Sequence, residues 1–384
     1  MTHRERFFAL LEGRPLDRAP FFPDVTNWYA ARRTLAGQPR RFGSGTFIPD
    51  DDPIHQFPGD MPEAFRDWTF LDFHRRFDWG LPVHLYDWAR WERAGFERSV
   101  SRGGARRVTR LRTPLGTLEK VELLAADGSW APVEHFAKGV GDLEVAAYVA
   151  RHTRVVPDPG RIRAVLEAVG PWGVGDVVLS RSPFGKLVHE WMGVERTAYA
   201  LVDAPAAVRD YLAVQERADL VEVEQAARMP ARVVILSDHA DESLIPPTWY
   251  REFCIPFYRK ACRILHDAGK VVSTHLDGNI RGILPLLGET TFDLLDGCTP
   301  APMTNYEVEG LAQAMPPGMS CYCGVPATFF SQGLPTETIL AYGRRILDAF
   351  AGRVLLNVGD ILPTDGSIEQ VIALGELAGG YPTA

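Results

Sequence analysis

The chain has 384 residues, of which 46% are hydrophobic and 23% charged, and its formal net charge is −8 at pH 7. This composition is too apolar for a disordered chain, and no apolar run approaches the 18 residues expected of a membrane span. The N-terminus carries both signs of charge, unlike a secretory signal, so we expect a cytoplasmic protein. The basic cluster at residues 102–112 is interrupted by Gly and Thr, which argues against nucleic-acid binding.

The N-terminal residues predict a helix over residues 3–12, with Thr2 as its N-cap and Glu5 as the capping-box partner. Residues 19–22 predict a first buried strand, and Asp24 follows directly after it. The helix and this strand open the chain before its less regular part.

The next segments have no clear period. Residues 37–60 are rich in Gly, Pro and Asp and predict a long surface loop. Residues 61–98 are dense in Trp and Phe, which predicts an aromatic core with a short helix or, alternatively, an aromatic wall that faces a substrate. Residues 107–124 alternate at period two around a turn at residues 114–116, which predicts an inserted antiparallel β-hairpin.

From residue 142 onward, short apolar strands alternate with helical segments, and this order favours a parallel sheet with helical crossovers. The predicted strands are 19–22, one in 81–86, 174–179, 233–236, 271–274, 292–295, 319–323 and 354–357. The predicted helices are 142–153, 158–169, 187–202, 206–229, 249–268, 280–287, 306–315, 336–351 and 367–377. Eight strands spread over residues 1–384 predict a single α/β domain, a (β/α)8 TIM barrel that carries the inserted hairpin.

Polar side chains collect where the predicted strands end, which is the edge that bears the active site in barrel enzymes. They are Asp24, Ser237, Asp238, His239, Asp241, His275, Asp277, Asn279, Asp296, Cys298, Cys321, Cys323, Asn357 and Asp360. One Asp after a strand is often the N-cap of the next helix, and one Cys is often a small buried apolar residue. Helix capping does not select His or Cys, so the repetition predicts a functional site.

The pair His275-x-Asp277 is the most informative of these, because residues i and i+2 of an extended strand point to the same side. An imidazole and a carboxylate form part of a ligand set for Zn²⁺ or another divalent ion, with Asp360, Cys323 or Asp238 as the third ligand. The alternative is an acid–base or substrate-binding pair without metal, in which the carboxylate orients the ring.

Several of these segments resemble the uroporphyrinogen decarboxylase superfamily, which includes zinc-dependent methyltransferases that serve corrinoid proteins. The resemblance covers residues 1–30 and 110–384 and is strongest after residue 233. The segments that carry it are Met1–Pro20, Ser237–Pro256, His275-Leu276-Asp277-Gly278-Asn279, Cys323–Glu337 and Asn357–Asp365. The resemblance implies the same barrel fold.

The sequence departs from the decarboxylases of this superfamily at two places. They carry arginines just after the first strand, which meet the substrate carboxylates, whereas residues 23–29 here contain none. Their histidine after the last strand is replaced by Asp360. Asp24 and Asp360 would repel an octa-carboxylate substrate, so we expect a different reaction.

The corrinoid-dependent methyltransferases use a His, Cys, Cys zinc set, and by position the resemblance implies His275, Asp277 and Asp360 as the metal ligands. It further implies catalytic or positioning roles for Asp238 and His239 beside His275 and Asp277. Substrate contacts are assigned to Asp24, Asn279, Asp296, Cys323 and Asn357. Two carboxylates and one imidazole suit zinc but also other divalent metals.

The predicted function is therefore a metal-assisted methyltransferase or demethylase component that moves a methyl group between a small substrate and a corrinoid protein. Two alternatives remain: a metal-free decarboxylase acting on a smaller or tetrapyrrole carboxylate, and a non-catalytic corrinoid- or tetrapyrrole-binding protein. Neither nucleic acid nor membrane is an expected partner, and a homodimer fits the superfamily. The five cysteines are expected to be free thiols or metal ligands.

Overall fold

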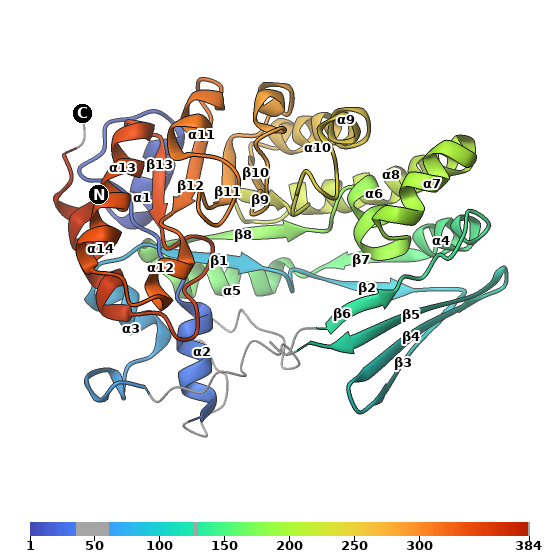
Figure 1. Cartoon of the computed structure of the whole chain (residues 1–384), viewed down its shortest axis with the longest axis horizontal. Helices are drawn as coiled ribbons and strands as arrows, with labels where there is room; N and C mark the ends of the chain where they lie inside the picture. Colours follow the sequence, from blue (N-terminus) through green and yellow to red (C-terminus); the bar gives the residue numbers. More distant parts are fainter. Residues whose placement is uncertain (36–60, 126–129, 383–384) are drawn as a thin grey trace.

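The protein is described by a computed structural model that covers residues 1–35, 61–125 and 130–382 (Figure 1). The loop predicted at residues 37–60 lies outside the described residues. No helix in the described part is long and apolar enough to cross a membrane.

The centre of the fold is a curled parallel sheet of seven strands in the order β1-β8-β9-β10-β11-β12-β13. The strands are β1 Leu81–Leu85, β8 Gly173–Leu179, β9 Val233–Leu236, β10 Val271–His275, β11 Leu294–Cys298, β12 Ser320–Gly324 and β13 Val354–Asn357. Most of their residues are buried on both sides, as expected for parallel strands covered by helices. Seven of the eight predicted strands are thereby confirmed, although β11 begins two residues later than predicted.

The eighth predicted strand, residues 19–22, is wrong as a regular strand. Only Phe21 forms a parallel bridge, opposite Leu356 of β13. The amide of Phe22 donates to the carbonyl of Leu356 (3.0 Å), and the amide of Gly80 donates to the carbonyl of Phe21 (2.8 Å). Pro20 and Pro23 flank this stretch and remove amide donors, so the pairing does not extend.

Helices lie on the outside of the sheet (Figure 1). They are α1 His3–Leu11, α2 Thr26–Leu35, η1 Glu63–Phe65, α3 Phe70–Arg76, α4 Asp142–Arg151, α5 Pro159–Val169, η2 Gly170–Trp172, α6 Pro183–Lys186, η3 Leu187–Trp191, α7 Val194–Asp203, α8 Pro205–Ala227, α9 Pro247–Trp249, η4 Tyr250–Cys254, α10 Ile255–Asp267, η5 Leu284–Glu289, α11 Val308–Ala314, α12 Ala327–Ser331, α13 Thr336–Phe350 and α14 Ile368–Gly380. The capping box at Thr2 and Glu5 is present at the start of α1, as predicted.

Two helix predictions need correction. The helix predicted at 187–202 is divided into the π-helix η3 and the α-helix α7, because Gly193 adopts φ 81° between them. The helix predicted at 280–287 is a short 3-10 helix, η5. Pro285 near the start of η5 removes a backbone donor, which disfavours a regular α-helix over this stretch.

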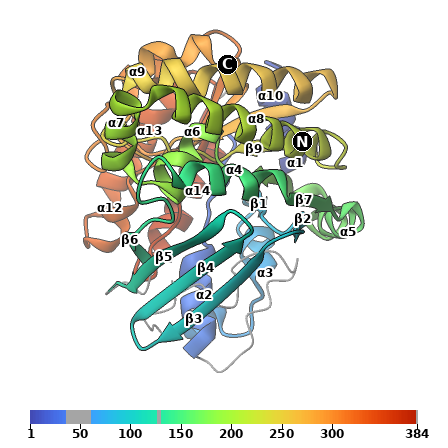
Figure 2. The same ribbon diagram turned by 90° about the vertical axis from the view of Figure 1, so that its right-hand side faces the viewer.

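The predicted hairpin at 107–124 is confirmed and belongs to a larger antiparallel sheet. Its strands β4 Arg106–Thr113 and β5 Gly116–Leu124 pair between β3 Glu97–Gly103 and β6 Trp130–Glu134. β2 Ala89–Arg93 pairs with β7 Thr153–Pro157 in a separate two-stranded sheet. Figure 2 shows the four-stranded sheet as a layer of its own below α4.

The aromatic-rich stretch from residue 61 packs as core, as the first of the two interpretations predicted. Phe73, Trp79 and Trp88 are almost fully buried, and Phe73 contacts the rings of Trp28 and Tyr29. A separate cluster closes the amino-terminal end of the sheet, where α1 packs. It contains Phe7, Leu10, Phe22, Val174, Val233, Leu294, Tyr322 and Leu355.

Candidate active site

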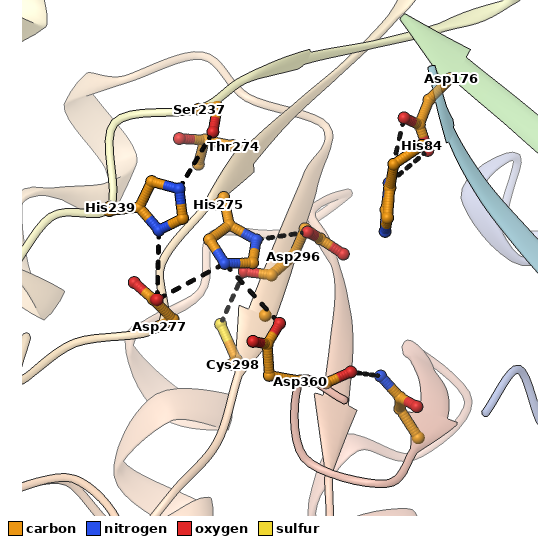
Figure 3. Close-up of polar contacts among 12 residues, drawn as sticks. His84, Asp176, Ser237, His239, Thr274, His275, Asp277, Asp296, Cys298 and Asp360 are labelled. Atoms are coloured by element: carbon orange, nitrogen blue, oxygen red, sulfur yellow. Dashed lines mark hydrogen bonds and ion pairs between the residues drawn. The ribbon is translucent and has the colours of Figure 1, made fainter. Parts of the chain in front are cut away.

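His275 occupies the last position of β10 and is the centre of a cluster of polar side chains (Figure 3). Its Nδ1 donates to Oδ2 of Asp296 (2.7 Å), which lies directly opposite on β11. This bond fixes the orientation of the ring, so that Nε2 faces Asp277 (3.6 Å) and Asp360 (3.7 Å). The structure therefore brings His275, Asp277, Asp296 and Asp360 together.

His239 joins this cluster from the neighbouring strand end. Its Nδ1 donates to Oδ2 of Asp277 (3.1 Å), and Ser237 Oγ lies 3.3 Å from its Nε2. The ring centroids of His239 and His275 are 4.6 Å apart, and the ring planes are inclined at 62° to each other. His239 (φ 49°) and Asp360 (φ 50°) both adopt the left-handed backbone region, which is strained for residues with a side chain. Such strain is typical of functional sites.

Three of these side chains are arranged so that they could hold a metal ion. One donor atom each from His239, His275 and Asp277 lies within 4.8 Å of the other two. Asp360 lies beside this group as an ion-pair partner of His275, so the tightest set contains His239 where the resemblance implied Asp360. Two imidazoles and a carboxylate fit Zn²⁺ and similar divalent ions, and the Asp296–His275 bond is the support that metal-binding imidazoles normally have.

The charges of the cluster depend on one another. Burial alone would lower the pKa of His275, but hydrogen bonds to Asp277 and Asp296 outweigh it and raise this pKa well above its ordinary value. Burial favours neutral Asp277, but hydrogen bonds to His239 and His275 outweigh it and lower the pKa of this carboxyl. Burial raises the pKa of Asp360 to about 6, and the carboxylates of Asp296 and Asp277 add to the rise.

Asp238 was predicted beside His275 but is directed away from it. It is 1% exposed, and its two carboxylate oxygens accept from the amide of Ser182 (2.7 Å) and from the hydroxyl of Tyr258. These bonds connect the end of β9 to the first turn of α6 and to α10. The sequence placed Asp238 and His239 in the same loop but did not show that they point in different directions.

Asp24 and Asn357 organise the loops around Asp360. Asp24 accepts from the amide (2.8 Å) and the hydroxyl (2.6 Å) of Thr26, at the first residue of α2. Asn357 Oδ1 accepts from the amides of Asp24 (3.1 Å) and Val358 (2.7 Å), and its Nδ2 donates to the carbonyl of Asp360 (3.2 Å). The two residues thus join the first and last segments of the sheet next to the cluster.

Asn279 and Cys323 lie outside the His275 cluster. The amide and side-chain nitrogens of Asn279 both donate to Asp241 Oδ2 (2.9 and 3.2 Å), which fixes the loop after His275. Cys323 is completely buried on β12, two residues from Cys321. Tyr322 lies between them and lines the interior of the sheet, so both thiols point to the opposite face.

A second His–Asp pair lies inside the sheet and was missed in the sequence. His84 of β1 faces Asp176 of β8 in register, and its Nδ1 lies 3.1 Å from both carboxylate oxygens (Figure 3). Asp176 raises the pKa of His84 to about 10 against the effect of burial. Both residues and Asp296 border a cavity of about 20 Å³ that has room for one water molecule. The sequence did contain a signal for this pair, because His84 is a polar residue within a segment that was predicted to be a buried strand.

The site can be compared with known proteins. Residues 178–378, just over half of the chain, match the family described as Uroporphyrinogen decarboxylase (URO-D). No curated protein sequence matches the chain significantly. Among solved structures, a methyltransferase from Methanosarcina mazei superimposes with a TM-score of 0.62 and 16% identity over 98% of both chains, which shows a shared fold.

Two more distant structures were also found. A B12-independent methionine synthase from Shewanella sp. has a TM-score of 0.45 and 9% identity, over 81% of this chain and 84% of that chain. A D-psicose 3-epimerase from Clostridium cellulolyticum has a TM-score of 0.35 and 8% identity, over 58% and 82%. Neither likeness is strong enough to add to the argument. The match over residues 178–378 and the seven-stranded parallel sheet together show that the chain belongs to the uroporphyrinogen decarboxylase family.

Proposed function

We propose that this protein is a metal-assisted methyltransferase that moves a methyl group between a small substrate and a corrinoid protein. The observation that carries the proposal is the convergence of His239, His275 and Asp277 at the carboxyl ends of β9 and β10. This edge of a parallel sheet is where enzymes of this architecture carry out their chemistry. The fold shared with a methyltransferase from Methanosarcina mazei is compatible with it.

The donor set fits a divalent ion such as Zn²⁺, held by His239, His275 and Asp277. When bound, such an ion supplies Lewis-acid polarisation of the heteroatom that carries the methyl group. Asp296 accepts from Nδ1 of His275 and orients the ring so that Nε2 faces the site, where a bound metal would replace the Nε2 proton that the neighbouring carboxylates favour. Asp360, whose pKa is raised to about 6, is placed to hold or release a proton near the substrate.

The remaining predicted residues act by positioning. Asp238 fixes the loop that carries His239, and Asn279 fixes the loop that follows His275. Asn357 and Asp24 hold the backbone next to Asp360. We assign no substrate contact to Cys323, because its thiol is completely buried. Three carboxylates, Asp277, Asp296 and Asp360, surround His275, which disfavours the highly carboxylated substrate of a heme-pathway decarboxylase.

The proposal is tested by measuring metal content and methyl transfer on the same purified protein. We expect near-stoichiometric Zn²⁺ or another divalent metal, methyl transfer to a corrinoid acceptor, and loss of that transfer on chelation with recovery on adding metal back. Methyl transfer that survives complete chelation would contradict the role of the metal, and metal-independent release of CO2 from a carboxylate would instead support a metal-free lyase. Tight tetrapyrrole or corrinoid binding with no turnover of any methyl donor would support the binding-only alternative.

A further inference from the structure

Two side chains near the cluster, one arginine and one histidine, have buried nitrogen atoms with no hydrogen-bond partner among the described residues. They are Nε of Arg181 and Nε2 of His189. Arg181 follows β8 by two residues, at the same edge of the sheet as His239, and His189 lies in η3. A buried donor without an acceptor destabilises the fold, so two such donors in one region point to a group that accepts from them.

The two side chains act on each other and on the candidate active site. Burial is the main cause that lowers the pKa of His189 to about 4, and the charge of Arg181 is the next cause. Asp238, His239 and His135 are the other groups whose charges influence His189. His189 is thus a neutral donor or acceptor at pH 7 within the electrostatic range of both Arg181 and His239.

His189 lies in a segment with an uncommon backbone conformation. η3 is a π-helix, a form that is rare and is found frequently at functional sites. It begins directly after α6, whose first turn is bound by Asp238 through the amide of Ser182. The same carboxylate therefore positions the loop that carries His239 and the segment that carries His189.

Arg181 is only partly satisfied. Its Nη1 lies 3.5 Å from Glu190 Oε1, a long contact at a half-exposed position. Glu190 occupies this terminal nitrogen and leaves Nε for another acceptor. Nε of Arg181 and Nε2 of His189 are both left without an acceptor, and a carboxylate offers two oxygens that can accept one bond from each. A tetrahedral phosphate would place further charge close to Glu190.

We propose that Arg181 and His189 form a binding site for a carboxylate group of the substrate, next to the cluster of His239, His275 and Asp277. This inference rests on the proposed function and extends it by naming the substrate class. The substrate is a small methylated carboxylate, with its anionic group at Arg181 and its methyl-bearing atom at the cluster. The site differs from the arginines of the heme-pathway decarboxylases, which follow the first strand.

The test uses metal-free protein, so that coordination of a carboxylate to a metal cannot account for binding. Benzoate, its neutral analogue benzamide, and inorganic phosphate are titrated by calorimetry. In parallel, the pKa of His189 is followed by NMR of histidine ring carbons, assigned with the His189→Gln variant. We expect benzoate to bind at least tenfold more tightly than benzamide or phosphate and to raise the His189 pKa by at least one unit.

Variants separate this site from general charge effects. Arg181→Gln should weaken benzoate binding by about tenfold or more, because it removes a charge-assisted hydrogen bond to the carboxylate. Arg163→Gln removes an exposed arginine on α5 and should leave benzoate binding unchanged. The wild-type comparison of benzoate with benzamide needs no variant, so poor folding of Arg181→Gln does not affect it.

Equal binding of benzoate and benzamide, or a benzoate affinity that Arg181→Gln leaves unchanged, would overturn this inference. Tighter binding of phosphate than of benzoate would also contradict it. Such results leave the metal site untouched, because zinc content and methyl transfer are measured separately. Conversely, benzoate binding to a protein that takes up no metal would retain the carboxylate site and refute the proposed methyltransferase.

Discussion

The His275 cluster can be compared with a second group of charged side chains, formed by Lys186 of α6 with Asp219 and Glu222 of α8. Lys186 Nζ bonds to Asp219 Oδ1, and Glu222 Oε2 lies 3.9 Å away. All three side chains are less than 10% exposed. In the His275 cluster, by contrast, Asp277 and Asp360 are 35% and 41% exposed.

The two groups differ in where their polar atoms point. In the Lys186 cluster the groups bond to each other and to near neighbours, such as Gln215 Nε2 on Asp219 and Ser180 on Glu222. In the His275 cluster three carboxylates, Asp277, Asp296 and Asp360, surround one imidazole, and two of these carboxylates are partly exposed. Removing the cation from a buried pair of carboxylates is costly to the fold, whereas partly exposed acceptors at the carboxyl ends of strands are accessible to a ligand. Each of the following changes tests that distinction.

His275→Ala should cause the largest loss. We expect methyl transfer to fall on the order of 10³-fold, with a smaller loss of stability than in Lys186→Met, because Asp277 and Asp360 are partly exposed to water while only Asp296 loses a partner in a buried position. Initial rates and thermal unfolding measure the two effects. His266→Ala is the matched control, since His266 forms a similar pair with Asp293 (2.9 Å) at the surface and should retain full activity.

Lys186→Met should show the opposite pattern. It leaves two buried carboxylates without their cation, so the free energy of unfolding should fall by about 3–5 kcal/mol. Denaturant unfolding measures this loss. Lys260→Met breaks the exposed pair with Glu216 and should cost no more than about 1 kcal/mol. Equal effects of the two substitutions would remove the contrast between buried and exposed pairs.

Asp296→Asn should weaken the metal site without abolishing it. Asn can still accept from His275 Nδ1 but carries no charge, so we expect a 10- to 100-fold loss of zinc affinity, measured by competition with a chelator. Asp365→Asn alters an exposed carboxylate that accepts from Ser331 and should leave the affinity unchanged. Unaltered zinc affinity in Asp296→Asn would argue that His275 is not a ligand.

The pH dependence of stability should depend on Asp219. Burial and the nearby Glu222 raise the pKa of Asp219 to about 7, against the effect of Lys186, while its ordinary value is 3.8. Between pH 4 and 7 the folded state therefore binds a proton that the unfolded state does not. This group accordingly makes stability fall as pH rises, by up to about 1.4 kcal/mol per unit. Asp219→Asn should flatten the pH dependence of the denaturation midpoint.

Cys323→Ala should have the smallest effect on function. We expect zinc affinity and methyl transfer within about twofold of the wild type, because the thiol is buried on the face of β12 opposite to Tyr322. The same measurements as for Asp296→Asn apply. A large loss of zinc in this variant would return a thiolate to the ligand set.

The sequence predicted the sheet better than it predicted the site. Buried strands such as β9 and β10 have strong apolar patterns, and the i, i+2 spacing correctly put His275 and Asp277 on one side. The place of His239 depends on its positive φ, and the direction of Asp238 depends on Ser182 and Tyr258, which are far away in sequence. Such three-dimensional features leave no periodic signal. The prediction of a strand at 19–22 was wrong for a local reason, because Pro20 and Pro23 lack the amide donors that a regular strand needs.

The position of helix α1 has a consequence for the order in which ligands bind. Phe7 and Phe22 close the amino-terminal end of the sheet beneath His84 and Asp176, so the His275 cluster is reached from the opposite end. In the proposed reaction, substrate and a corrinoid protein would both reach the cluster from this end. Because the methyl group passes directly from one to the other, the substrate has to bind first and stay bound while the corrinoid protein covers the opening. Turnover of the proposed methyltransferase should accordingly follow an ordered sequence through a complex that holds both.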